Sequence, residues 1–164
     1  TVTAALRAPG ENDPDFPALH VLSRVLDDGM STRLYQRVVN ELGLAYYVSA
    51  GLDSFPDVSI FDIEATAVHA RVPELLREVL GLLRGLREQP VSDAELAKIK
   101  RRHRWDLLTA CDEPGAMADW WGRGELYHKP LPLPERLARI EAVTAADIQR
   151  VAARVVRTIA RHPL

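Results

Sequence analysis

Cysteine is almost absent from this sequence of 164 residues, and its scarcity narrows the possible chemistry. The single cysteine, Cys111, excludes a disulfide bond within the chain and any metal site built from several cysteines. Cys111 follows a segment with helical spacing, so we interpret it as a small core residue on a helix rather than as a reactive thiol.

The sequence also lacks a strong excess of charge and any long apolar segment. Its formal net charge is −2, which gives no reason to expect nucleic acid or an anionic membrane as a partner. No apolar run approaches the roughly 20 residues that a transmembrane helix needs. With 47% hydrophobic and 27% charged residues, the composition is that of an ordinary globular domain with a substantial core.

A histidine pair suited to zinc is missing as well. A helix presents two histidines on one face when they are four residues apart. None of the five histidines has another histidine at that distance; they are His20, His69, His103, His128 and His162. We therefore predict that each is an ordinary surface or core residue and that this chain holds no metal.

The sequence does contain a regular succession of strand-like and helical segments. Apolar and polar residues alternate at 2–6, 44–52 and 58–68, as in strands with one wet face. Apolar residues recur at helical spacing in 16–27, 31–42, 73–88, 92–110, 116–127, 135–141 and 145–157. The order β-α-α-β-β-α-α-α-α-α predicts an α+β fold with two layers, a mostly antiparallel sheet covered on one face by several helices.

The most informative local pattern lies between residues 31 and 52. Ser31 suits the N-cap of a helix, because its hydroxyl can accept a hydrogen bond from a first-turn N–H. Gly43 stands where this helix should end in the left-handed conformation. A strand follows at once, and its adjacent tyrosines, Tyr46 and Tyr47, should face opposite sides of the sheet.

Three further patterns in the second half give local predictions. Ser92 and Glu95 match a capping box, in which each side chain satisfies the other residue's backbone N–H. The last helix should be capped by Thr144, with an aspartate in its first turn. Trp120 and Trp121 lie about 100° apart around a helix, so we expect one in the core and the other at an interface.

Two charged clusters are interpreted as solvated faces. The basic run at 98–104 spreads around a helix axis and is balanced by acidic segments, so it does not indicate a nucleic-acid site. Asp62 and Glu64 lie two residues apart on a predicted strand. Because no partner histidine or metal motif accompanies them, we assign them no acid–base chemistry.

Several motifs, in this order and spacing, resemble the pitrilysin/insulinase family of inverted-zincin zinc metallopeptidases. The main match is S-T-R-L-Y-Q at 31–36 followed by N-E-L-G-L-A-Y-Y-V at 40–48, which is similar to the family run S-R-L…G-L-A-Y. Shorter matches that extend the resemblance over nearly the whole chain lie at 7–10, 22–29, 92–98 and 140–148.

The resemblance implies a place in a tandem architecture. The family hydrolyses peptide bonds with zinc held by H-x-x-E-H and a later glutamate, and this motif belongs to the first of two half-domains. The chain resembles the second, non-metal half, which implies zinc in the parent protein and none bound by this fragment. The implied partners are an N-terminal zinc-binding half-domain or partner subunit, peptide substrates, and a second protomer in a dimer.

One functional pair of the family maps only in part. In many members a partner domain supplies an arginine and a tyrosine, seven residues apart, which hydrogen-bond the substrate carbonyl and the developing oxyanion. The tyrosine position is Tyr46, but the arginine position holds Val39. Either Arg33 or Arg37 takes the arginine's role beside Tyr46, or this domain never contributes the pair. A tyrosine packed on a strand, with its hydroxyl at the rim, is the alternative for Tyr46, and we assign no catalytic residue.

Three interpretations of the function stay open. The first is the C-terminal, substrate-enclosing domain of a zinc-dependent metalloendopeptidase, which is inactive alone. The second is a non-catalytic scaffold or partner subunit, and an H-x-x-E-H motif upstream would favour the first over it. The third is a free-standing module that binds extended peptides at its sheet edge. The peptide substrate and the compartment stay undetermined, since a bacterial periplasmic or cytoplasmic setting would follow family habit alone.

The ends of the sequence predict a single domain, 1–164, that is a fragment of a longer chain. The sequence opens on a strand without an initiator methionine and stops abruptly at 161–164. The family's half-domain has a further strand after its last helix, and only Thr158, Ile159 and Ala160 could begin it here.

Overall fold

The computed structural model describes the backbone of residues 1–127 and 130–161, and the side chains of these residues except at 127 and 158–161. The order of elements matches the pattern predicted from the sequence and confirms the α+β class. In chain order the elements are β1 (Val2–Pro9), α1 (Phe16–Leu26), α2 (Arg33–Tyr35), the π-helical turn η1 (Gln36–Glu41), β2 (Ala45–Ser54), β3 (Val58–Ala67), the 3-10 turn η2 (His69–Arg71), α3 (Val72–Glu88), α4 (Asp93–Ala110), α5 (Pro114–Tyr127), α6 (Leu133–Glu141) and α7 (Ala145–Arg161).

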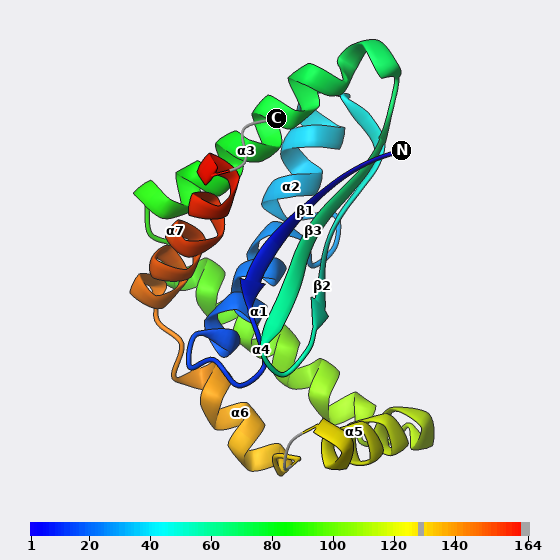
Figure 1. The fold of residues 1–164 in the computed structure, drawn as a ribbon, viewed down its shortest axis with the longest axis vertical. Helices are drawn as coiled ribbons and strands as arrows, with labels where there is room; N and C mark the ends of the chain where they lie inside the picture. Colours follow the sequence, from blue (N-terminus) through cyan, green and yellow to red (C-terminus); the bar gives the residue numbers. More distant parts are fainter. Residues whose placement is uncertain (128–129, 162–164) are drawn as a thin grey trace.

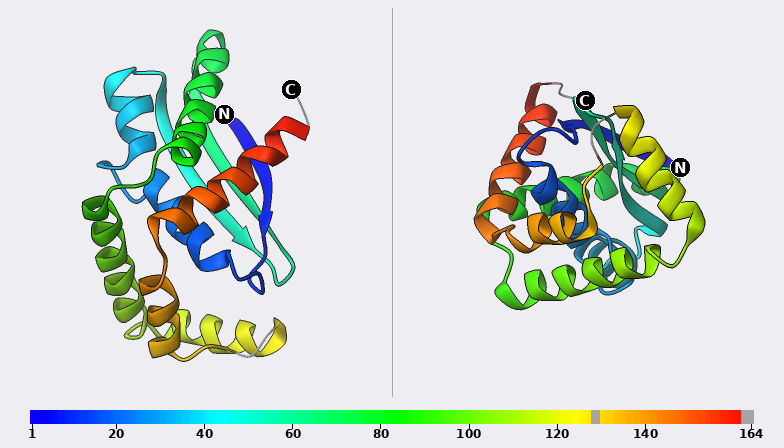
Figure 2. Two further views of the ribbon diagram at one scale, coloured as in Figure 1. Left: turned by 90° about the vertical axis from the view of Figure 1, so that its left-hand side faces the viewer. Right: turned by 90° about the horizontal axis from the view of Figure 1, so that it is seen from below.

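Strand β3 is the centre of an antiparallel sheet with the strand order β1-β3-β2. Phe61 of β3 lies opposite Leu6 of β1 and Leu52 of β2, so a row of apolar side chains crosses the sheet. Helices α1 and α7 lie over this face and α3 lies beside α7, whereas α5 and α6 lie beyond one end of the sheet (Figures 1 and 2). In the described part of the chain, no helix covers the other face (Figure 2).

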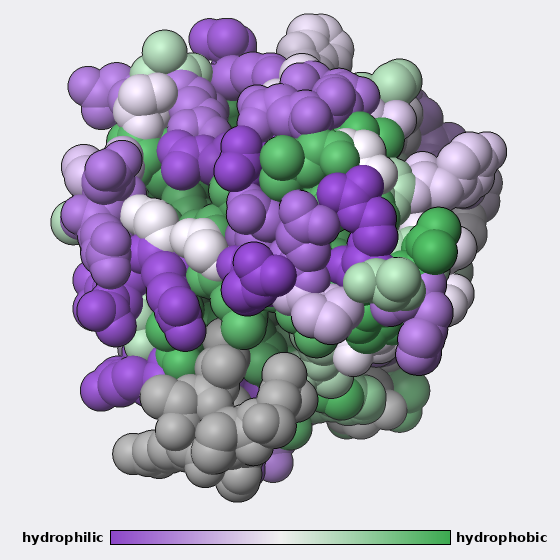
Figure 3. Space-filling view, turned by 90° about the horizontal axis from the view of Figure 1, so that it is seen from above, coloured by the Kyte–Doolittle hydropathy of each residue, from purple (hydrophilic) through white to green (hydrophobic). Residues whose placement is uncertain are grey.

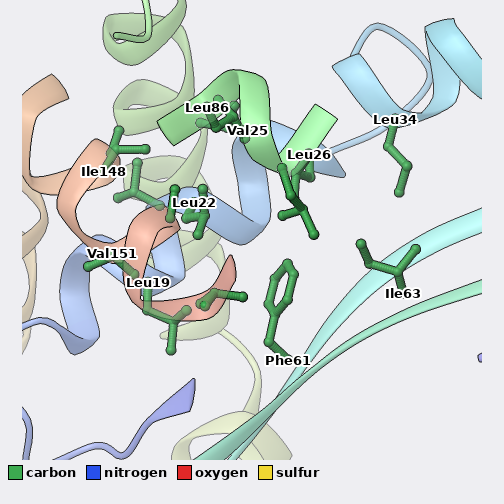
Figure 4. Close-up of a cluster of buried hydrophobic side chains, with 14 of the residues drawn as sticks. Leu19, Leu22, Val25, Leu26, Leu34, Phe61, Ile63, Leu86, Ile148 and Val151 are labelled. Atoms are coloured by element: carbon green, nitrogen blue, oxygen red, sulfur yellow. The ribbon is translucent and has the colours of Figure 1, made fainter. Parts of the chain in front are cut away.

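The core lies between the sheet and these helices. Phe61 points from β3 toward α1, where it meets a cluster of fully buried side chains (Figure 4). Burying each such side chain stabilises the fold by about 1.5–3 kcal/mol. The predicted alternation along β3 is confirmed, because Phe61, Ile63 and Ala65 are buried while Asp62 and Glu64 lie on the open face.

The segment before β2 confirms one local prediction and corrects another. Gly43 has a φ of +55°, so it ends the helical segment in the left-handed conformation as predicted. Ser31 is not the N-cap: the helix begins at Arg33 after Thr32, whose hydroxyl donates to the Gly29 carbonyl at 2.5 Å. The Ser31 hydroxyl instead accepts a hydrogen bond from Lys98 Nζ of α4 at 2.8 Å, a long-range contact that local sequence could not indicate.

The strict alternation predicted for the adjacent tyrosines fails at a β-bulge. Ala45 pairs with Ala67 and Tyr47 with Thr66, so Tyr46 is the extra residue of β2. Tyr46 and Tyr47 are 91% and 49% exposed, and neither ring enters the core. The bulge thus turns both phenols toward solvent between buried neighbours.

Several predictions for the second half need correction. Ser92 accepts a hydrogen bond from Glu95 N at 3.3 Å, but the Glu95 carboxylate binds another residue, so only half of the capping box forms. Cys111 is not a core residue on a helix, because it is the half-buried C-cap of α4. Residues 158–160 do not begin a strand, since they continue helix α7.

The caps and aromatic residues near α5 and α7 give a mixed outcome. Thr144 caps α7 as predicted: its Oγ1 accepts from Asp147 N at 3.2 Å, and Asp147 Oδ2 accepts from Thr144 N at 2.9 Å. Trp120 is only half-buried rather than in the core, and it stacks on the exposed Trp121 with 6.4 Å between ring centroids.

Polar residues dominate the surface at the upper end of the molecule. The face in Figure 3 is largely hydrophilic, with apolar residues scattered between the charged ones. Among the described residues, no helix is both long enough and apolar enough to span a bilayer.

Candidate functional site

The bulge of β2 places Tyr46 at a solvent-exposed corner of the sheet. Tyr47 and Val68 are also exposed at the end where Ala45 pairs with Ala67, and we call these three residues the β2 corner: Tyr46, Tyr47 and Val68. Within the described residues, no hydrogen bond is formed by the Tyr46 hydroxyl. The 91% exposure of Tyr46 leaves its ring outside the core.

Arg33, one of the two arginines predicted to act with Tyr46, is held in a bidentate ion pair. Its Nε and Nη2 donate to the two carboxylate oxygens of Glu95 at 2.8 and 2.6 Å. Hydrogen bonding to Glu95 raises the pKa of Arg33 above its ordinary value. The pair joins α2 to α4, so the guanidinium fork is already occupied.

Arg37, the other candidate arginine, also binds carboxylates. Its Nη1 donates to Glu41 and its Nε donates to Glu78, both at 2.9 Å. These hydrogen bonds raise the pKa of Arg37. Val39, at the family's arginine position, packs half-buried against the core. The structure therefore brings neither Arg33 nor Arg37 into a hydrogen bond with Tyr46.

The described residues offer no metal centre of the usual kind. No group of three or more histidine, cysteine, aspartate or glutamate side chains among them could hold a metal ion. Of the five histidines, His69 is exposed, whereas His128 and His162 lie outside the described residues.

The two remaining histidines form a pair that the sequence did not indicate, because they are far apart in the chain. His20 of α1 and His103 of α4 have ring centroids 4.8 Å apart, and the Nδ1 atom of each is buried without a hydrogen-bond partner. Burial is the main cause that lowers their pKa values, to about 4 for His20 and about 3 for His103. Both rings are therefore neutral near pH 7.

A second feature that sequence reasoning missed joins the loop before α1 to α7. Asp15 accepts hydrogen bonds from Arg150 and Arg154, and Asp13 accepts from Arg154. Arginine hydrogen bonds hold the pKa of both carboxyl groups below their ordinary values, although burial opposes the shift. The cluster fixes this loop against the last helix.

A large cavity opens beside this loop, between the sheet end and the α5–α6 arm, defined by residues 114–127 and 133–141. Its volume is about 1290 Å³, and its walls include Phe16, His20, Phe55, His103, Trp120 and Arg136. Arg123 of α5 spans from the arm to the sheet: Nη2 donates to the Ser54 carbonyl at 2.6 Å and lies 3.6 Å from Glu11 Oε1.

The open face of the sheet is acidic near the same end. Burial raises the pKa of Asp62, and the neighbouring carboxylates of Asp53 and Glu64 raise it further. No histidine or metal ligand set joins Asp62 and Glu64 within the described residues. Both side chains lie half-buried on the open face of the sheet, where the solvated-face interpretation placed them.

Comparison with known sequences identifies the kind of domain. Residues 1–102 match the family model described as the peptidase M16 inactive domain. A protein of Mycobacterium tuberculosis, named as an uncharacterized zinc protease, is 30% identical over 152 residues, which are 92% of this chain and 35% of the relative. The chain thus spans about a third of the length of the curated relatives it matches.

Solved structures share the fold over nearly the whole chain. A protease from Helicobacter pylori superposes with a TM-score of 0.87 at 22% identity, covering 95% of this chain and 38% of that chain. A peptidase M16 inactive domain from Pseudomonas fluorescens gives a TM-score of 0.78 at 20% identity, covering 96% of this chain and 40% of that chain.

Proposed function

This chain belongs to the peptidase M16 family as a domain of its inactive type, and we propose that it is the C-terminal wall of a peptide-enclosing chamber in a zinc metallopeptidase. The match of residues 1–102 to the inactive domain carries the proposal. Relatives that contain this region in about a third of their length are named zinc proteases. The zinc and its H-x-x-E-H ligands would then belong to an N-terminal half-domain or to a partner subunit.

The β2 corner is the part of the wall that we propose to contact the substrate. Tyr46 is exposed at a bulge and has a free hydroxyl among the described residues, so it can donate to a carbonyl oxygen or an oxyanion of an extended peptide. Arg33 and Arg37 would serve this corner indirectly, because their ion pairs hold α2 and η1 against α4 and α3.

A free-standing module that binds peptides along the sheet edge is less well supported. The outer edge of β2 is partly occupied, since Ala50 N donates to the Asp27 carboxylate at 3.0 Å. A capped edge N–H is a common way of preventing an added strand. This observation favours a wall that acts together with a partner, and a dimer or tandem pair of half-domains is part of the proposal.

A non-catalytic scaffold is the second candidate, and one observation favours it. With Val39 at the family's arginine position and both nearby arginines bound to glutamates, the corner offers a phenol without an adjacent free guanidinium. A domain that only supports the zinc-binding half would not need a free guanidinium beside the phenol.

Kinetics of the parent protein with a fluorogenic peptide would separate these candidates. If Tyr46 contacts the transition state, Tyr46→Phe should lower kcat/KM by about 10²-fold, because it removes one donor to the developing oxyanion. Tyr35→Phe, which removes a phenol hydroxyl outside the β2 corner, is the matched control and should change kcat/KM less than twofold. Equal activity of the Tyr46→Phe variant and the unmodified protein would reject the contact and favour the scaffold.

A further inference from the structure

The cavity beside the α5–α6 arm has the dimensions of a peptide site. Its volume of about 1290 Å³ exceeds the roughly 300–1,000 Å³ of ordinary small-molecule pockets. Apolar rings of Phe16 and Phe55 line it together with nine acidic and basic residues. Such a space fits several residues of an extended chain better than a single small metabolite.

Arg136 stands out among the arginines that line this cavity. Its guanidinium carbon lies 3.9 Å from the centre of the Trp120 ring, in a cation–π stack. Within the described residues Arg136 and the exposed Arg139 form no ion pair and no hydrogen bond, whereas Arg123 and Arg150 bind carboxylates or carbonyls. Of these two unpaired arginines, Arg136 is the half-buried one. Burial lowers the pKa of Arg136, and the negative charge of Glu11 only partly opposes this shift.

The tryptophan beneath Arg136 is held in place on both sides. Trp120 Nε1 donates to the Leu131 carbonyl at 3.1 Å, and its ring stacks on Trp121 with an interplanar angle of 14°. Gly124 lets Pro130, the residue before Leu131, lie close to α5, since a Cβ on Gly124 would lie 2.7 Å from Pro130 Cβ. The guanidinium therefore rests on a ring whose position these contacts fix.

The wall near Arg136 carries charges of both signs and neutral polar groups: Glu11, whose carboxylate acts on Arg136, also lies 3.6 Å from Arg123. His103 is only 6% exposed, lines the cavity, and keeps its Nδ1 without a partner. Arg24 and Arg136 both lie near the histidine pair, and their charges help to keep its rings neutral. An anion placed at Arg136 would compensate this field, and burial would strengthen the interaction.

The rim limits how much negative charge a ligand could carry. Asp53 and Asp119 line the cavity and are exposed, so they would repel a phosphate-rich or polyacidic ligand at the entrance. A ligand with one carboxylate and otherwise uncharged residues avoids that repulsion. A peptide with a single carboxyl group is the simplest molecule that meets both conditions.

We propose that this cavity binds a peptide by one carboxylate, which docks on the Arg136 guanidinium above Trp120 while apolar side chains lie against Phe16 and Phe55. The carboxylate can be a C-terminus or an acidic side chain, and either can accept two parallel N–H bonds from the fork. The proposal rests on the proposed function for the presence of peptides. The site is separate from the β2 corner.

Fluorescence anisotropy with the 164-residue chain tests the proposal. Three labelled peptides of apolar sequence differ only in charge: one has a free C-terminus, one has a C-terminal amide, and one has the amide plus a single internal glutamate. We expect binding of the free acid, of the glutamate peptide or of both, and at least tenfold weaker binding of the neutral amide. Comparison of the two acidic peptides identifies the source of the carboxylate.

Two variants make the test specific. Arg136→Gln should weaken binding of the acidic peptide about tenfold, whereas Arg104→Gln, the same charge change at an exposed α4 position outside the cavity, should alter it less than twofold. Equal binding of acid and amide peptides, or equal loss in both variants, would overturn the proposal.

A labelling experiment covers the possibility that the Arg136→Gln variant misfolds. A dicarbonyl reagent that modifies arginine should label Arg136 in the unmodified chain, and bound acidic peptide should protect Arg136 but not Arg104. Equal labelling of Arg136 with and without saturating peptide would also refute the site. Either failure leaves the chamber proposal intact, because that proposal is judged by hydrolysis in the parent protein and by Tyr46.

Discussion

The arginines that join helices to each other and the arginine inside the cavity differ in what they bind. Arg33, Arg150 and Arg154 each donate to carboxylates brought from distant parts of the chain. Arg136 lies on an aromatic ring, and no carboxylate within the described residues pairs with it. The first group pairs with carboxylates within the fold, whereas the binding site proposed above would supply Arg136 with a carboxylate from a peptide.

The difference teaches how stability and binding are divided in this domain. The layer formed by the sheet, α1 and α7 contains the buried core, and its ion pairs are satisfied internally. The α5–α6 arm exposes Trp121 and Leu126 and borders a cavity with unpaired polar groups. Substitutions should therefore affect stability in the layer and ligand binding in the arm.

The largest contrast should come from aromatic truncations in the two regions. Phe61→Ala leaves a cavity beneath the helices and should lower the free energy of unfolding by about 3–5 kcal/mol. Trp121→Ala, at a position 47% exposed on the arm, should lower it by less than about 1 kcal/mol. Urea denaturation measures both values, and equal losses would show that the arm shares the core's stability.

Acid should act on the histidine pair between these regions. The folded-state pKa of His103 is about 3, below its ordinary value of 6.5, so the stability due to its neutral burial is fully present above pH 6.5 and is lost as pH falls toward 3. Between pH 7 and pH 5 this loss should be on the order of 2 kcal/mol. Urea titrations at both pH values should show a smaller loss for His103→Leu, and an unchanged one for the exposed control His69→Gln.

Breaking the ion cluster before α1 should have a moderate effect. Asp15→Asn removes a buried carboxylate from Arg150 and Arg154, and should cost about 2 kcal/mol at pH 7. Asp57→Asn in the exposed hairpin turn makes the same chemical change and should cost little. The depressed pKa of Asp15 means that its contribution is present above pH 4 and disappears as pH falls further. Equal costs of the two substitutions would contradict this role.

The Arg33–Glu95 pair should give the smallest effect. A double-mutant cycle with Arg33→Ala and Glu95→Ala should yield a coupling free energy of about 1 kcal/mol, because the pair is bidentate but about a third exposed. Zero coupling would indicate that the guanidinium is free to act elsewhere, as the alternative role beside Tyr46 requires.

Local patterns in the sequence predicted the helices and strands well, because each pattern depends only on residues that are close together in the chain. The alternation in β3, the left-handed Gly43 and the Thr144 cap all follow from a few adjacent residues. The order of strands and helices, and with it the α+β class, followed from the same periodicities.

Features that depend on contacts between distant residues could not be predicted in this way. The bulge at Tyr46 needs the register against β3, and the Arg136–Trp120 stack and the His20–His103 pair need the tertiary fold. The Glu95 carboxylate does not complete the capping box, because it forms stronger, charge-assisted hydrogen bonds with Arg33. The adjacent tryptophans at 120 and 121 stood out in the sequence, but nothing local to them indicated a cavity.

Mixing this chain with the zinc-binding half of its parent protein tests the central claim most directly. Hydrolysis of a fluorogenic peptide and zinc content by mass spectrometry should be measured for each part and for the mixture. We predict that this chain alone has neither zinc nor activity and that it raises the hydrolysis rate of the zinc half. Stoichiometric zinc or hydrolysis in the chain alone, or no change on mixing, would contradict a role as the wall of the chamber.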